Sequence, residues 1–216
     1  MTPRGPNRTP KPSTANRVSA GGRATATVGD ISREAHAKEL VAAAQSDFGG
    51  ITSIVCSHIR HVPYLPVTEL PLEEWQGSLD VNLTGIFLLL KNAIPVMAGG
   101  GGSITLMASQ LAFAPKPGRA WYVAQKGAII SLVKALAVDH AKDNIRANTI
   151  SPGPTADDRF FSQWSSEEEA HANASTLFGR LGYPSEMAAG AVFLASDEAS
   201  FVTGTDLLID GGYTAV

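Results

Sequence analysis

The sequence has little material for covalent cross-linking or for membrane insertion. Its 216 residues include one cysteine, Cys56, which excludes an internal disulfide framework. The longest strongly apolar stretch, 86–90, ends at Lys91 and is far too short to cross a bilayer. The first thirty residues lack the apolar run of a secretion signal. We therefore expect a cytoplasmic protein without a membrane partner.

Acidic side chains are absent from the first 29 residues, which carry five basic ones. The remaining residues, 30–216, hold 12 basic and 20 acidic side chains, a net charge of −8. An acidic body argues against nucleic acid as the main partner. The first twelve residues contain four prolines and no apolar periodicity. We predict a disordered tail over residues 1–22 and one folded domain over residues 23–216.

Short apolar runs alternate with longer amphipathic stretches from residue 23 onward. The short runs predict strands at 24–30, 51–56, 103–109, 145–151 and 206–209. Apolar residues at helical spacing predict helices at 34–48, 72–97, 119–142 and 184–195. Strands joined by helical crossovers pair in parallel, with helices on both faces of the sheet. The expected fold is a doubly wound α/β sheet, Rossmann-like, with its ligands at the carboxyl ends of the strands.

Three residues predicted near those strand ends could transfer a proton. Tyr122 and Lys126 are four residues apart on a predicted helix, so their side chains leave the same face one turn apart. A tyrosine has an ordinary pKa of about 10, and a nearby ammonium favours its phenolate. Ser109 ends a predicted strand and could hold the substrate oxygen that gains or loses the proton. Taken alone, the Tyr-x-x-x-Lys spacing is weak, and an ordinary helix surface is the better interpretation.

The segment 102–127, GSITLMASQLAFAPKPGRAWYVAQKG, resembles the short-chain dehydrogenase/reductase family. It has that family's Ser, its Tyr-x-x-x-Lys and the thirteen-residue step between Ser and Tyr. Further stretches match the family in the same order: 29–32, 80–85, 145–148, 151–154, 179–184, 201–204 and 209–212. The resemblance covers roughly residues 20 to 216, and as an ordered set the motifs are highly specific.

The resemblance implies roles for four residues in a reaction on a small-molecule carbonyl or alcohol. Tyr122 would be the general acid/base, and Lys126 would lower its pKa and contact the nicotinamide ribose. Ser109 would orient the substrate oxygen, and Asn82 would maintain a water-linked proton relay to Lys126. The family commonly forms homodimers or homotetramers through two long helices, here 72–97 and about 119–142, and the C-terminal region. We expect the same assembly.

The same resemblance implies NAD or NADP as the cofactor. Asp30 and Ile31 would flank its adenine, while Pro152, Gly153 and Thr155 would lie beside its nicotinamide, which Tyr122 and Lys126 also approach. The variable stretch 156–178 has two equally supported interpretations. It would be either a lid over the substrate or a solvated helical insertion.

Two departures from the family pattern affect the nucleotide half of the predicted site. The family begins with a strand, a glycine-rich turn and a helix, whereas here only the proline-rich tail precedes the strand predicted at 24–30. We therefore expect an N-terminally truncated member that lacks the first βαβ segment. The family's Asn-Asn-Ala-Gly is replaced by 56–59, Cys-Ser-His-Ile. An isoleucine in place of glycine adds bulk beside the cofactor ribose.

Cys56, His58 and His61 lie close together in the sequence, and cysteine and histidine are zinc ligands. Three candidate ligands are a weak metal signal. A buried thiol beside loop histidines is the favoured interpretation, so we predict no metal site.

The leading functional hypothesis is an oxidoreductase that transfers a hydride between a nicotinamide cofactor and a carbonyl or secondary alcohol. One alternative is a cofactor-independent lyase, isomerase or hydrolase, because the Ser-Tyr-Lys set can shuttle a proton without a hydride. The other alternative is an inactive, truncated copy that acts only as a subunit partner.

Overall fold

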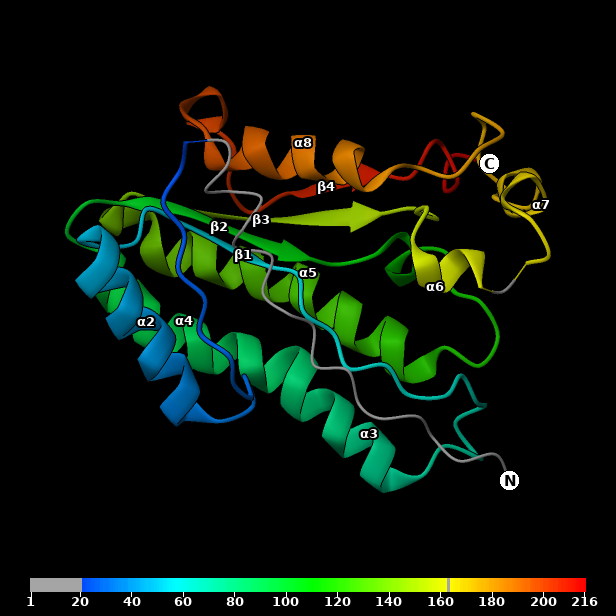
Figure 1. The fold of residues 1–216 in the computed structure, drawn as a ribbon, viewed down its shortest axis with the longest axis horizontal. Helices are drawn as coiled ribbons and strands as arrows, with labels where there is room; N and C mark the ends of the chain where they lie inside the picture. Colours follow the sequence, from blue (N-terminus) through cyan, green and yellow to red (C-terminus); the bar gives the residue numbers. More distant parts are fainter. Residues whose placement is uncertain (1–20, 163) are drawn as a thin grey trace.

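A parallel sheet forms the centre of the computed structural model, which describes residues 21–162 and 164–216. The predicted tail, residues 1–22, lies almost wholly outside the described residues. Within them the strand order is β1-β2-β3-β4, and every neighbouring pair is parallel (Figure 1). The strands are β1 Ser53–Cys56, β2 Gly102–Met107, β3 Ile145–Pro152 and β4 Asp206–Ile209. The sheet therefore follows the predicted parallel arrangement.

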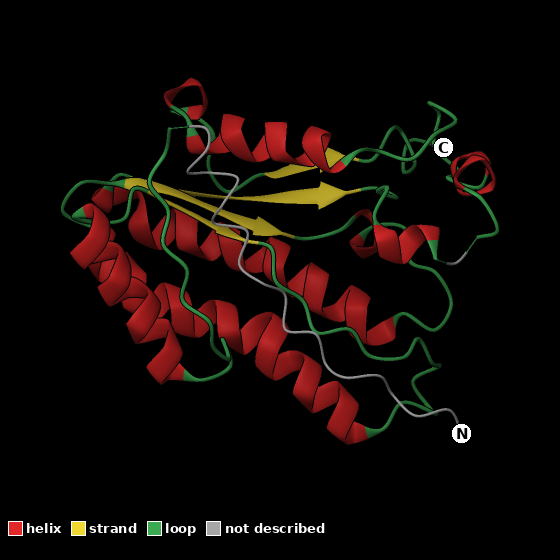
Figure 2. Cartoon of the chain, in the orientation of Figure 1, coloured by secondary structure: helices red, strands yellow, loops and turns green. Residues whose placement is uncertain are grey.

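Helices cover both faces of this sheet (Figure 2). The α8 helix packs on one face against β2, β3 and β4, whereas α5 packs on the other face against β2 and β3. The α4 helix lies beside α5 and carries α2 on its outer side. The helices are α2 Glu34–Phe48, α3 Leu72–Leu79, α4 Gly85–Met97, α5 Ala120–His140, α6 Asp158–Phe161, α7 Glu167–Ala172 and α8 Pro184–Ala195. This is the doubly wound α/β arrangement that the sequence predicts.

The strand predicted at 24–30 is not formed, and that prediction is wrong. The segment is irregular and mostly exposed in the structure. A strand needs a neighbour to accept its backbone hydrogen bonds. Within the described residues β1 is an edge strand that pairs only with β2, so residues 24–30 have no ladder to join.

The helix predicted over 72–97 forms one continuous helical path with a change of winding in its middle. Between α3 and α4 lies a π-helical turn, η1, at Asp80–Thr84. Such turns are rare and occur often at functional sites. Asn82 lies in this turn and is buried. The change of winding could not be predicted from apolar spacing, because a turn of only 5 residues is too short to show a period of its own.

The main core lies between the sheet and the layer of α4 and α5. It contains Ile86 and Leu90 of α4, Ile104 of β2, and Ile129 and Val133 of α5. Two helical stretches, Leu72–Met97 and Ala120–Asp143, are long and apolar enough to cross a membrane by length and composition alone. In this fold the buried faces of both stretches pack in the core.

Candidate active site

A cavity of about 680 Å³ lies at the carboxyl ends of the strands. It is lined by Ser57 and His58 after β1, by Ala108 and Ser109 after β2, and by Gly153 after β3. Its volume is within the usual range for small-molecule and cofactor pockets. A doubly wound sheet is expected to bind its ligands at this edge.

The structure brings Ser109, Tyr122 and Lys126 together in the wall of this cavity. Ser109 is buried, and its Oγ accepts a hydrogen bond of 3.2 Å from the backbone N–H of Leu111, at the start of a short 3₁₀ turn. Tyr122 and Lys126 lie one turn apart on α5, with the Lys126 Nζ 5.6 Å from the centroid of the Tyr122 ring. Tyr122 and Lys126 therefore share one face of α5, as their spacing predicts.

Lys126 is held in a buried position by the neighbouring strand. Lys126 is only 6% exposed. Its Nζ donates a 2.6 Å hydrogen bond to the carbonyl oxygen of Met107 in β2. Burial lowers the pKa of Lys126 to about 8. Near neutral pH the cavity wall therefore contains a cation whose charge can be lost by a modest rise in pH.

Asn82 lies behind the cavity wall and joins two elements. Its Nδ2 donates to the backbone oxygen of Arg60 at 3.0 Å and to the Oε1 of Gln125 at 2.9 Å. Its Oδ1 accepts from the Arg60 N–H at 2.6 Å. Gln125 is the chain neighbour of Lys126 and donates to the Oγ of Ser78 on α3. These bonds fix the β1–α3 loop against α5, and the proton relay through Asn82 stays a prediction.

Pro152, Gly153 and Thr155 line the cavity, and their predicted place beside the nicotinamide stays a prediction. The Thr155 hydroxyl donates to the Gly153 carbonyl at 3.0 Å, which holds the loop in a tight turn. A Cβ built on Gly153 would lie 2.5 Å from the Cα of Asp210, just after β4. Glycine is required at this position because the chain after β4 passes so close.

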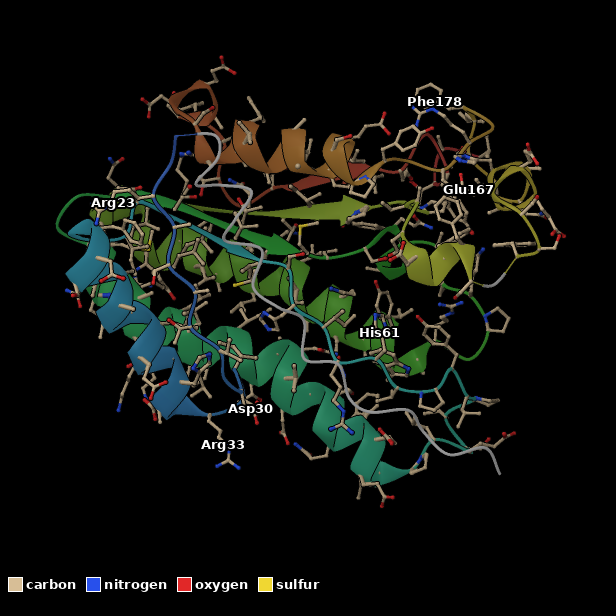
Figure 3. The ribbon with its side chains drawn as sticks, in the orientation of Figure 1. Arg23, Asp30, Arg33, His61, Glu167 and Phe178 are labelled. Carbon is tan, nitrogen blue, oxygen red and sulfur yellow. The ribbon has the colours of Figure 1, made fainter. Side chains whose placement is uncertain are left out.

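The structure does not bring Asp30 and Ile31 to the cavity that holds Tyr122. Asp30 is exposed and accepts hydrogen bonds from the N–H and the hydroxyl of Ser32, at 3.0 and 2.6 Å. Ile31 packs against Gly85 at the start of α4. Figure 3 shows Asp30 well apart from His61, a residue of the cavity lining. The predicted adenine contacts thus lie outside the described cavity.

The segment that replaces the family's Asn-Asn-Ala-Gly forms one wall of the cavity. His58 and Ile59 both line it, and the His58 Nε2 lies 3.1 Å from the Val81 carbonyl oxygen. Burial lowers the pKa of His58, which favours the neutral ring. Burial raises the pKa of Cys56 to about 12, so its thiol stays protonated. In the described part of the chain, no group of three or more His, Cys, Asp or Glu residues could hold a metal ion.

Two cavity residues were not singled out from the sequence, although both lie inside the quoted motif. Lys116 and Arg119 belong to the loop between Ser109 and Tyr122 and line the same cavity. The Arg119 guanidinium carbon lies 3.5 Å from the centroid of the Tyr64 ring. The sequence signal is the two basic residues before the tyrosine, but the contacts of Arg119 with Tyr64 and of Lys116 with Tyr213 depend on the fold.

Four described residues of the stretch 156–178 line the cavity, namely Asp157, Phe160, Asn173 and Ala174. Phe160, Phe161 and Trp164 of this stretch pack on Ala170 and Leu181, which gives the stretch its own apolar cluster. Part of the stretch therefore lies at the cavity wall, although most of its described residues are exposed, and its role as a lid stays a prediction.

Comparison with known proteins agrees with this geometry. The family model described as enoyl-(acyl carrier protein) reductase matches residues 7–214. A 2,5-dichloro-2,5-cyclohexadiene-1,4-diol dehydrogenase of Sphingobium indicum is 36% identical over 203 residues, which cover 92% of this chain and 81% of the relative. A cis-4-hydroxycyclohexanecarboxylate dehydrogenase of Sinomonas cyclohexanicum is 35% identical over 198 residues, covering 91% and 79%. A crystal structure of a short-chain type dehydrogenase/reductase from Mycobacterium marinum matches with a TM-score of 0.82 at 31% identity, covering 94% of this chain and 79% of that one.

Proposed function

The chain belongs to the short-chain dehydrogenase/reductase family, and on that premise we propose that its Ser109, Tyr122 and Lys126 form the catalytic site. It is an oxidoreductase of that type, which transfers a hydride between NAD or NADP and a carbonyl or secondary alcohol. The observation that carries the catalytic assignment is the presence of all three side chains in one cavity at the carboxyl ends of the strands.

The cavity fits the nicotinamide and ribose end of such a cofactor. Lys126 supplies a buried ammonium for ribose hydroxyls, and Pro152, Gly153 and Thr155 supply a close-packed loop for the nicotinamide. Among the described residues, no glycine-rich turn joins a strand to a following helix, so the fit is limited to this end. When bound, the cofactor supplies or accepts the hydride.

Tyr122 moves the proton at the substrate oxygen. During reduction of a carbonyl its O–H donates a proton to the oxygen that develops negative charge, and during oxidation its phenolate takes the proton from the alcohol. The Lys126 ammonium, close to the ring, stabilises the phenolate electrostatically. Because Met107 holds the ammonium in place, no reorganisation of Lys126 is needed as the proton moves.

Ser109 orients the same substrate oxygen. Its Oγ accepts a hydrogen bond from the Leu111 N–H, which fixes the oxygen while the hydroxyl proton can be donated to the substrate. Donors that are already in place at the developing charge are the largest usual contribution to such catalysis.

The stretch 156–178 acts as the substrate lid in this proposal. Phe160 lines the cavity, and the backbone N–H of the same residue is capped by the Asp157 carboxylate at 2.6 Å, which starts α6. An apolar side chain at the cavity wall excludes water and strengthens the electrostatic interactions inside.

The test is the oxidation of NADH and NADPH by the purified protein with cyclohexanone, a ring ketone matched to the alcohols for which the two relatives are named. The wild type should consume one of the two cofactors in proportion to the ketone. Tyr122→Phe removes only the proton-transferring hydroxyl and should lower kcat by about a hundredfold or more.

A Tyr122→Phe variant that keeps its full rate would contradict the assignment. So would cofactor-independent conversion of a carbonyl compound with no oxidation of NADH or NADPH, because that outcome indicates proton transfer without a hydride. Fluorescence titration of both cofactors with the variant separates loss of chemistry from loss of binding.

A further inference from the structure

Two positively charged side chains lie in the substrate cavity without a negative partner. The exposed Lys116 and the half-buried Arg119 both line it and also border a second cavity of about 410 Å³. Neither forms an ion pair with a residue that the structure describes. The acidic lining residue is Asp157, and its carboxylate caps the start of α6. The surplus of positive charge is notable because residues 30–216 carry a net charge of −8.

The Arg119 guanidinium is held against an aromatic ring. Its carbon lies 3.5 Å from the centroid of the Tyr64 ring, and Tyr64 is itself stacked on the buried Trp121, with centroids 6.0 Å apart. Stacking occupies the face of a guanidinium but leaves the N–H groups in its plane. The fork is thereby oriented before a ligand arrives.

The Arg119 Nε–H is buried and has no hydrogen-bond partner among the described residues. A buried donor without a partner costs free energy, and a charged donor costs more. Because protein atoms enclose this Nε–H, an anionic oxygen in the cavity would accept from the terminal N–H groups of the half-buried guanidinium, which are not enclosed in this way. Carboxylate and phosphate groups are the acceptors whose geometry matches a guanidinium fork.

The order of residues along α5 indicates which ligand carries this anion. Arg119 is the N-cap residue of α5, three positions before Tyr122, whereas Lys126 follows Tyr122 by one helical turn. Tyr122 therefore lies between the ribose-binding ammonium and Arg119. The Arg119 side of Tyr122 is left for the part of the substrate beyond the reacting carbon.

We propose that Arg119, with Lys116, binds a negatively charged group on the substrate, a carboxylate or a phosphate, and so selects anionic carbonyl compounds or alcohols. The inference rests on the proposed function because it places the reacting oxygen at Tyr122. Lys116 stands over the ring of Tyr213, with its Nζ 5.3 Å from the ring centroid, and adds a second positive charge at the same end of the cavity.

The test compares two ketones of nearly equal shape, 4-oxocyclohexanecarboxylate and its neutral carboxamide. Their binding to the full chain is measured by calorimetry, alone and with saturating oxidised NAD or NADP, which cannot reduce a ketone. The carboxylate should bind wild type about tenfold to a hundredfold more tightly than the carboxamide. This preference should shrink at high salt.

Arg119→Gln should bring the ratio of the two affinities close to one. Lys134→Gln removes an exposed charge of α5 outside the cavity and should keep the wild-type ratio. Equal binding of the two ketones to wild type, no binding of either, or an unchanged ratio in Arg119→Gln would each overturn the proposal.

Two further outcomes distinguish an anion site for the substrate from a phosphate site for the cofactor, and from the proposed function itself. If Arg119→Gln weakens binding of NADP but not of NAD and leaves the ketone ratio unchanged, the cations serve a phosphate of the cofactor and the proposal is overturned. The proposed function is tested separately, by measuring the reduction of either ketone with NADH or NADPH. Turnover of both ketones at equal efficiency would leave that function standing and overturn the anion preference.

Discussion

Lys126 carries the sharpest electrostatic signature of the site. Its ordinary pKa of 10.5 falls to about 8 because burial disfavours the ammonium. In the unfolded chain the amine is solvated and keeps its ordinary pKa. Between pH 8 and pH 10.5 the unfolded state therefore binds more protons than the folded state, and stability rises with pH over this range.

We predict that Lys126→Met is more stable than wild type at pH 7, because methionine fills a similar volume without a buried charge. The stability difference should shrink between pH 8 and pH 10.5, as the folded wild type loses its charge. Urea unfolding at pH 7 and pH 10 measures it. Lys134→Met, at an exposed position of the same helix, is the control whose difference should stay constant. A Lys126→Met difference that is independent of pH, or grows with it, would contradict the account.

Ser109, Tyr122 and Lys126 could be predicted from the sequence because helical spacing places the last two on one face and the resemblance of 102–127 to the family adds the serine. Arg119 could not be recognised in that way. Its orientation depends on stacking with Tyr64, which belongs to a loop far earlier in the chain. Contacts of this kind are set by tertiary packing, and local spacing carries no information about them.

A helix or strand predicted from the sequence forms in the structure where another element packs against it or pairs with it. The helix predicted at 184–195 has the predicted bounds because Pro184 opens it and its apolar side chains meet the sheet. The strand predicted at 24–30 fails because the described sheet offers it no neighbour. β-branched composition indicates a strand only where a ladder exists to receive it.

Helices α4 and α5 also expose large apolar side chains on the surface of the chain. Phe87 of α4 is 55% exposed and Val138 of α5 is 80% exposed. We propose that these helices pair with a second copy of the chain, which would bury both side chains. Exposed apolar patches of this kind commonly mark protein–protein contacts.

We predict that Val138→Glu shifts the protein from a dimer or tetramer to a smaller species, because a buried unpaired carboxylate disfavours association. Size-exclusion chromatography with light scattering measures the mass. Val28→Glu, in the irregular segment before α2, is the matched control, since Val28 is 72% exposed and lies outside the expected interfaces. A monomeric wild type, or dissociation by Val28→Glu alone, would refute the pairing of α4 and α5.

At the scale of the whole molecule, an acidic body surrounds a cavity that contains three cations, Lys116, Arg119 and Lys126. The fold places the strand ends, the start of α5 and part of the stretch 156–178 around one space. Proton transfer, substrate orientation and anion selection can therefore act on a single bound molecule. Family membership accounts for proton transfer and substrate orientation. The proposed anion selection depends on Lys116 and Arg119, before Tyr122 in this chain.

The central claim is that a hydride passes to a substrate carbon in this cavity. The most direct measurement uses NADH or NADPH that carries deuterium at the transferred position, with a ketone substrate and mass spectrometry of the product. The account predicts one deuterium on the new carbinol carbon, and far less product with Tyr122→Phe. A product without deuterium, formed at the wild-type rate, would contradict it.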